Sequence, residues 1–99
     1  MGIRDKDAAM LRHMGNAITD LQVQFRAATL EDQAVLSGPL RELLTDYGKY
    51  QARLLKSGTI TTEAELEEIR DIQTSISTAA SRQEMLIAIS RIVSLIAAA

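Results

Sequence analysis

The chain has 99 residues, of which 46% are hydrophobic and 24% are charged, a balance that is typical of one folded domain with a modest core. Its net charge of −2 excludes the strong basic field with which many proteins hold nucleic acid or an anionic membrane. Because the sequence contains no cysteine, disulfides, thiolate nucleophiles and cysteine-bound zinc are excluded as well. The few aromatic residues and the single proline favour an all-α fold with an aliphatic core.

The first predicted helix covers residues 5–28. Its apolar residues alternate steps of three and four, which places them on one face of a helix. They are Leu11, Met14, Ile18, Leu21, Phe25 and Ala28. Asp5 and Asp7 fall in the first turn, where a carboxylate complements the positive end of the helix dipole. Residues 1–10 are too charged to form the apolar part of a secretory signal, so we expect a cytoplasmic protein without a signal peptide.

The second predicted helix covers residues 39–57, preceded by a short helical approach at residues 30–36. Thr29 is a candidate N-cap for that approach. Gly38 and Pro39 predict a kink or break, although the apolar pattern continues across them and leaves a continuous helix open. This pattern consists of Leu36, Leu40, Leu43, Tyr47, Tyr50 and Leu54. We expect its two tyrosine rings in the core, with their hydroxyl groups at the rim.

The third predicted helix covers residues 63–96, which contain neither proline nor glycine. It begins at a capping box, in which the Thr62 side chain accepts from the N–H of Glu65 and the glutamate reaches back. Gly58 is expected to end the preceding helix, and the short connection after it predicts antiparallel packing of the second and third helices. The predicted fold is a single all-α domain over residues 1–99. It is an elongated antiparallel three-helix bundle, or helical hairpin, with a long C-terminal helix and coiled-coil-like packing.

The end of this long helix is expected to outrun its partners. Pairing from Pro39 would cover the long helix to about Ala80, and the approach from Leu30 would extend this cover only to about Ile89. Residues 90–99 would therefore extend past the bundle by about 15 Å. Twelve of the fifteen residues from 85 to 99 are apolar, a surface that a soluble monomer rarely leaves in water. We therefore predict an intermolecular interface formed by Met85, Leu86, Ile89, Ile92, Val93, Leu95 and Ile96. The alternative is that the first helix shifts or bends to cover them.

A membrane is another environment for an apolar C-terminus, but this run is short and interrupted. A transmembrane helix needs about twenty apolar residues. Arg82 and Glu84 precede the run, and Arg91 lies in its middle. An interfacial helix would need a basic polar face and aromatic side chains, which this segment does not have. The sequence therefore favours contact with another protein over contact with a membrane.

Residue types suited to catalysis or metal binding do not converge. His13 is the only histidine and lies off the apolar face, so we expect it in solvent. The acidic residues at the start of the third helix complement its dipole, an interpretation favoured over a metal site. They are Glu63, Glu65, Glu67, Glu68 and Asp71. Lys49, Arg53 and Lys56 form a basic stripe that is expected to face those acids across the hairpin. We predict no catalytic, cofactor-binding or metal-binding residue.

Together these features predict a non-catalytic helical assembly or adaptor protein that acts through protein packing. We expect it to self-associate through its C-terminal helix, so that its partner is a second copy or another helical protein rather than nucleic acid. Two alternatives stay open. One is a membrane-associated or export-apparatus subunit, and the other is a small regulator that binds and inhibits a partner protein.

Overall fold

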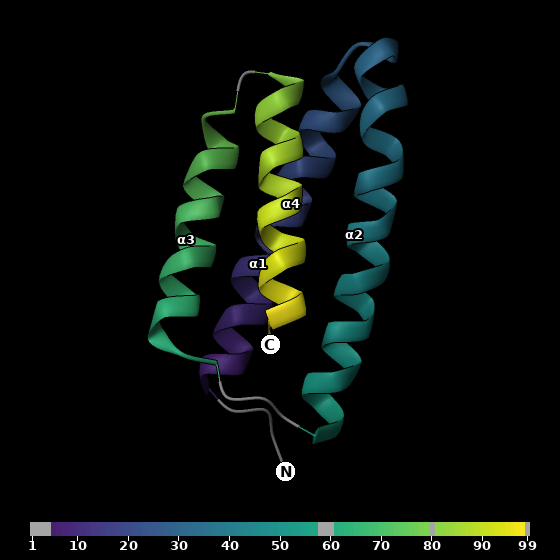
Figure 1. The fold of residues 1–99 in the computed structure, drawn as a ribbon. Coiled ribbons are helices and arrows are strands. Elements are labelled where there is room, and N and C mark those ends of the chain that lie inside the picture. Colours follow the sequence, from purple (N-terminus) through teal and green to yellow (C-terminus); the bar gives the residue numbers. More distant parts are fainter. Residues whose placement is uncertain (1–4, 58–60, 80, 99) are drawn as a thin grey trace.

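The computed structural model describes residues 5–57, 61–79 and 81–98, and these residues form four helices instead of the three predicted. The helices are α1 (Asp5–Ala27), α2 (Leu30–Ser57), α3 (Glu63–Ser77) and α4 (Arg82–Ala98). They lie side by side along one axis, with α1 and α3 running in one direction and α2 and α4 in the other (Figure 1). The prediction of an all-α helical bundle is confirmed.

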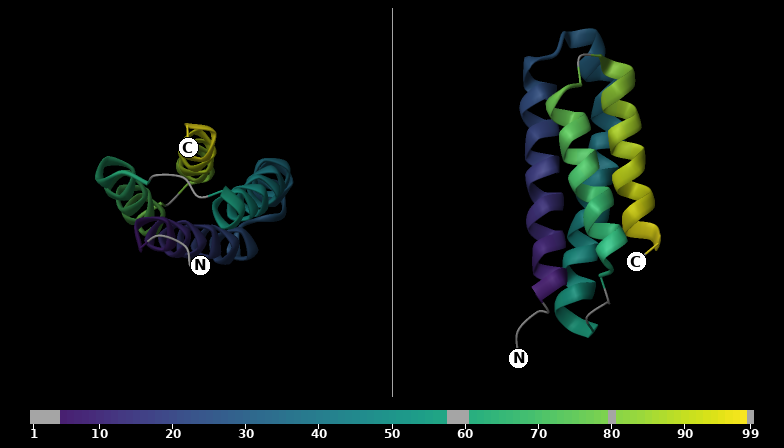
Figure 2. Two further views of the ribbon diagram at one scale, coloured as in Figure 1. Left: turned by 90° about the horizontal axis from the view of Figure 1, so that it is seen from below. Right: turned by 90° about the vertical axis from the view of Figure 1, so that its left-hand side faces the viewer.

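The four helices occupy four corners when the bundle is seen along its axis (Figure 2). α1 packs against α2 and α3, and α4 packs against the same two helices, so α2 and α3 lie at opposite corners. The predicted antiparallel packing of the second helix on the third is therefore wrong. α3 begins beside α1 because the carboxylate of Asp7 accepts hydrogen bonds from the backbone N–H of Thr61, at 3.2 Å, and from its hydroxyl group.

The dimensions of the bundle are 45 × 22 × 19 Å, and its radius of gyration is 13.5 Å. A folded domain of 100 residues has a radius of gyration of about 13 Å. The predicted elongated three-helix arrangement is therefore wrong, and the fold is a compact four-helix bundle. The error lies in the predicted helix at residues 63–96, because α3 ends at Ser77 and the chain turns back into α4.

Side-chain caps separate α3 from α4. Thr78 caps the end of α3, where its backbone N–H donates to a carbonyl of the last turn at 3.3 Å. Ser81 caps the start of α4, because its hydroxyl accepts from the N–H of Glu84 at 3.2 Å and donates to the Glu84 carboxylate at 3.1 Å. Ser81 and Glu84 have the same spacing as Thr62 and Glu65, whose predicted capping box is present at the start of α3. The pair Ser81 and Glu84 therefore indicates the start of α4 in the sequence, although no glycine or proline interrupts the chain there.

α2 is one helix from Leu30 to Ser57 with Pro39 inside it. The predicted break at this proline is therefore wrong. Proline removes one backbone hydrogen bond from a helix, but the burial of Leu36 and Leu40 on either side of it offsets that loss. Gly58, which was predicted to end the helix, lies outside the described residues.

The first turn of α1 and the turn into α2 follow the sequence pattern. Asp5 and Asp7 lie in the first turn of α1, as predicted. The hydroxyl group of Thr29 accepts from the backbone N–H of Asp32 at 3.2 Å, which confirms this threonine as a cap. The side chain of Gln33 donates to the carbonyl of Phe25 at 2.9 Å and so connects the start of α2 to the end of α1.

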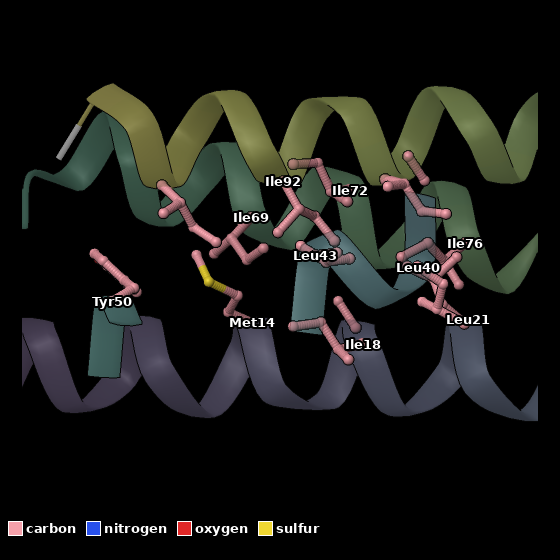
Figure 3. Packing of buried hydrophobic residues seen from close by; sticks show 14 of the residues in the cluster. Met14, Ile18, Leu21, Leu40, Leu43, Tyr50, Ile69, Ile72, Ile76 and Ile92 are labelled. Atoms are coloured by element: carbon pink, nitrogen blue, oxygen red, sulfur yellow. The ribbon is translucent and has the colours of Figure 1, made fainter. Parts of the chain in front are cut away.

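The core runs along the bundle axis and receives side chains from each described helix. Met14, Ile18 and Leu21 of α1 point toward the isoleucines of α3 and α4 (Figure 3). The buried apolar residues are Met10, Met14, Ala17, Ile18, Leu21, Leu36, Leu40, Leu43, Tyr50, Leu54, Leu66, Ile69, Ile72, Ile76, Met85, Ala88, Ile89, Ile92 and Ile96. Full burial of a large aliphatic side chain contributes about 1.5–3 kcal/mol, so this row is the main source of stability.

Candidate functional site

The predicted interface residues lie on α4, which packs against α2 and α3 of its own chain. Four of them are in the core, namely Met85, Ile89, Ile92 and Ile96, and the other three, Leu86, Val93 and Leu95, are half-buried against it. Arg53 of α2 donates to the carbonyl of Ile96 at 3.1 Å, so the last turn of α4 is level with α2. The predicted overhang is therefore wrong, although contact of these residues with a second molecule stays a prediction. No helix in the described ranges has the length and hydropathy needed to cross a bilayer.

A network centred on Arg91 closes the edge between α3 and α4. Its guanidinium group donates to Glu68 from Nη2 at 2.8 Å and from Nε at 3.2 Å, and to Asp71 at 2.9 Å. Hydrogen bonds to Asp71 and then to Glu68 raise the pKa of Arg91 above its already high ordinary value. The arginine that interrupts the apolar C-terminal run is therefore paired with the acids of α3.

Two of the other acidic residues at the start of α3, Glu63 and Glu65, have separate partners. The carboxylate of Glu63 lies 3.4 Å from the ammonium group of Lys6 on α1. Glu65 completes the capping box of its own helix. Within residues 5–57, 61–79 and 81–98, no three histidine, aspartate or glutamate side chains gather in a way that could hold a metal ion. These contacts position α3 in the bundle.

The basic residues of α2 do not face the acids of α3, because the two helices lie at opposite corners. That prediction is wrong. The guanidinium carbon of Arg53 lies 5.5 Å from the centroid of the Tyr50 ring, and the same group donates to the carbonyl of Ile96. A cation at the carbonyl end of a helix complements its dipole, so Arg53 stabilises the contact between α2 and α4.

Two side chains connect α1 to its neighbours. His13 is half-buried rather than in solvent as predicted, with its Nδ1 atom 2.9 Å from the side-chain oxygen of Gln73 on α3. Tyr47 is half-buried, as expected of a ring with its hydroxyl group at the rim, and this hydroxyl donates to the carbonyl of Leu11 at 2.9 Å. Gly15 permits this approach, because a Cβ atom there would lie 2.9 Å from the tyrosine oxygen. Burial raises the pKa of Tyr47.

The end of the bundle near Thr61 contains buried polar groups. Asp7 is buried, and its Oδ2 atom has no hydrogen-bond partner within the part of the chain that the structure describes. Tyr50 is also buried, and this burial raises its pKa while a hydrogen bond with Thr61 opposes the shift. The hydrogen bonds from Thr61 to Asp7 hold the start of α3 against α1, and its hydrogen bond with Tyr50 holds it against α2.

α2 carries a second row of leucines outside the core. Leu30, Leu44 and Leu55 are 85%, 40% and 73% exposed. The steps between them are close to whole numbers of helical turns, so the three side chains share one face of α2. The sequence signals this row in the leucine pairs at 43–44 and 54–55, of which only the first member continues the core pattern. Sequence reasoning followed that pattern alone and missed the row.

A groove of about 320 Å³ lies between α1 and α2 beside Leu44, and we call it the α1–α2 groove. Its lining residues are Gln22, Phe25 and Arg26 of α1 with Ser37, Leu40, Arg41 and Leu44 of α2. Phe25 and Leu40 form an apolar floor, since they are half-buried and buried. Arg26 and Arg41 are exposed on the two walls. The sequence did not predict this site, because its residues come from two helices and only two of them belong to the core pattern.

Charge distinguishes the α1–α2 groove from four other grooves formed by the described residues. Its two charged residues are both arginines, and in the described ranges neither Arg26 nor Arg41 forms an ion pair. The groove between α2 and α4 contains Asp46 beside its cations. The grooves along α4 contain Arg82 or Arg91 with an acidic residue.

The α1–α2 groove therefore suits a ligand that is apolar and negatively charged together. General acid–base or nucleophilic catalysis needs a histidine, a carboxylate or an activated nucleophile, none of which is among its lining residues. Comparison of the chain with protein-family models, with curated proteins and with solved structures finds no match.

Proposed function

We propose that this chain is a non-catalytic binding protein that acts through helix packing, and that it receives a helix of a partner protein in the α1–α2 groove. The observation that carries the proposal is the apolar floor of Phe25 and Leu40, with the exposed Leu44 beside it, between two antiparallel helices. An amphipathic helix that lays its apolar face into such a groove is a recurrent mode of peptide recognition.

The exposed leucine row supports a helical partner. Leu30 and Leu55 extend the surface beyond Leu44 on both sides, over a length of about 37 Å at ~1.5 Å per residue. Single exposed apolar residues are common on protein surfaces. Here the three leucines share one face of α2 and one of them lines the α1–α2 groove, so a helix that lies along α2 in the groove would contact this face.

The engagement of the polar side chains supports a binding role over a catalytic one. Within the described ranges, Arg91 of α4 pairs with Glu68 and Asp71 of α3, and the hydroxyl groups of Thr29, Thr62 and Ser81 cap helices. Active sites instead gather titratable groups in one cavity.

Site-specific photo-cross-linking in the native cells tests this proposal. A benzophenone amino acid replaces Leu44, and the matched control carries it at Ser94, which is exposed on the outer side of α4. We expect a discrete adduct from position 44 that is lost when Leu55 is changed to glutamate. Equal labelling from both positions contradicts the proposal. The mass of the adduct separates another protein from a second copy of this chain.

A further inference from the structure

We infer that the partner helix is acidic, with carboxylates on both flanks of its apolar face. This inference rests on the proposed function, because it names the chemistry of the helix that the α1–α2 groove receives. Arg26 lies on the α1 wall and Arg41 on the α2 wall, so the apolar floor has one cation on each side. A helix that fills the groove therefore brings both of its flanks near a guanidinium group.

The surrounding structure accounts for only one of these two cations. Arg26 lies in the last turn of α1, where a cation complements the carbonyl end of the helix. Arg41 lies in the interior of α2, beyond the reach of such an effect. Neither arginine forms an ion pair in residues 5–57, 61–79 and 81–98, which is also true of Arg12 and Arg70, but Arg26 and Arg41 line the same groove.

Binding of a helix removes water from the groove, and this makes the charge of the partner matter. A guanidinium group that loses water without gaining an acceptor destabilises the complex. A carboxylate supplies that acceptor and forms two parallel hydrogen bonds with arginine in favourable geometry. Opposite charges also accelerate encounter, and like charges exclude the wrong partner.

Neither α3 nor α4 of a second folded copy of this chain offers the required combination. The acids of α3 are not accompanied by exposed large apolar residues in the described part of that helix. α4 exposes only Ile87 among its described large apolar side chains. A helix of another protein with an apolar row and two acidic flanks matches the groove better than α3 or α4 of a second copy does.

The test uses three synthetic helical peptides that share the same row of leucines on one face. The positions on both sides of this row are all glutamate in the first peptide, all glutamine in the second and all lysine in the third. Each peptide is titrated into the ¹⁵N-labelled full chain, and amide shifts give both the location and the dissociation constant. We expect shifts confined to the α1–α2 groove and binding of the glutamate peptide at least about tenfold tighter than that of the lysine peptide.

The charge-reversed variant R26E/R41E is expected to invert the order of the peptides. Its matched control is R12E/R70E, which changes the net charge equally at exposed positions that do not line the groove. The control is expected to retain the preference for the glutamate peptide. Circular dichroism of both variants confirms that the fold is intact.

The outcomes separate the two proposals. Equal affinity of the three peptides for the groove overturns the acidic partner while leaving helix binding in the groove intact. The inference of an acidic partner is also overturned if R12E/R70E loses the preference for the glutamate peptide as R26E/R41E does. The net charge of the chain, and not the groove, would then determine the preference. Absence of groove shifts with all three peptides contradicts the proposed function itself. Concentration-dependent shifts of the groove without peptide would assign it to a second copy.

Discussion

Two opposite edges of the bundle carry arginines in different settings. On the edge between α3 and α4, Arg91 is bound by Glu68 and Asp71, so the two helices are joined by charge as well as by the core. On the edge between α1 and α2, Arg26 and Arg41 line an apolar groove and are not joined by such a pair in the described residues. The same residue type thus joins two helices at one edge and lines an apolar groove at the other.

The difference shows that exposure of apolar residues follows from topology more than from local composition. The most apolar segment of the sequence, α4, is covered by its own chain. α2 has a mixed composition but places leucines on the open edge. A candidate binding surface is therefore identified from the apolar residues that remain exposed after the helices have packed.

The largest expected loss of stability distinguishes the buried face of α4 from the exposed face of α2. Ile92→Ala should lower the free energy of unfolding by about 2–5 kcal/mol, since it leaves a cavity in a fully buried site. Leu30→Ala should change it by no more than about 0.5 kcal/mol. Ile87→Ala is the matched control on α4, where the side chain is 50% exposed, and should cost clearly less than Ile92→Ala. Urea denaturation followed by circular dichroism measures all three, and equal costs at 87 and 92 would show that α4 does not pack as described.

The next effect concerns the contact that places α3 beside α1. Asp7→Ala should cost about 1–3 kcal/mol, because it removes the acceptor for two hydrogen bonds from Thr61. Asp5→Ala is the control, since Asp5 lies in the same first turn but is exposed. It loses only the helix-dipole contribution, about 0.3–1 kcal/mol. Thermal unfolding checks the pair, and a larger loss for Asp5→Ala would refute this role for Asp7.

A smaller effect compares the arginines of the two edges directly. A double-mutant cycle with Arg91→Gln and Glu68→Gln should give a coupling of about 0.5–1 kcal/mol, because both side chains are partly exposed. The coupling should weaken at high salt. Arg41→Gln should change the stability of the free protein by less than about 0.5 kcal/mol. A stabilising role for Arg41 as large as that of Arg91 would remove the contrast between closed and open edges.

The smallest effect depends on pH and concerns the tyrosines of α2. Burial raises the pKa of Tyr50, and that of Tyr47, above the ordinary value of about 10. As pH rises through this range, the unfolded chain releases its phenolic protons first, so stability is full below about pH 10 and falls above it. Tyr50→Phe should therefore reduce the fall in the free energy of unfolding between pH 9 and 11. The measurement compares this fall in the variant with that in the wild-type chain. An unchanged decline would contradict a raised pKa for Tyr50.

The sequence predicts local features better than the pairing of helices. Thr29 and the capping box at Thr62 and Glu65 act within one turn, so their sequence spacing alone determines them. The box at Ser81 and Glu84 has the same spacing but lies in a run free of glycine and proline, and helical periodicity alone carries a predicted helix across it.

The placement of α3 could not be predicted, because it depends on contacts between residues far apart in the chain. Asp7 bonds to Thr61 across 54 positions. The α1–α2 groove likewise arises from residues of two helices whose spacing is set only after packing. Its one local trace is the leucine pair at 43–44, in which one side chain faces the core and the other does not.

The fold-back of α4 onto α3 is tested most directly by a distance between nitroxide labels at Glu68→Cys and Arg91→Cys, in a chain that has no other cysteine. Because these residues touch across the α3–α4 edge, the labels should lie on neighbouring helices whose axes are about 8–10 Å apart, and strong dipolar broadening is expected. An uninterrupted helix over residues 63–96 would separate the two positions by about 35 Å. A distance distribution centred near that larger value would contradict the four-helix bundle. It would indicate a continuous helix whose apolar C-terminal part is exposed.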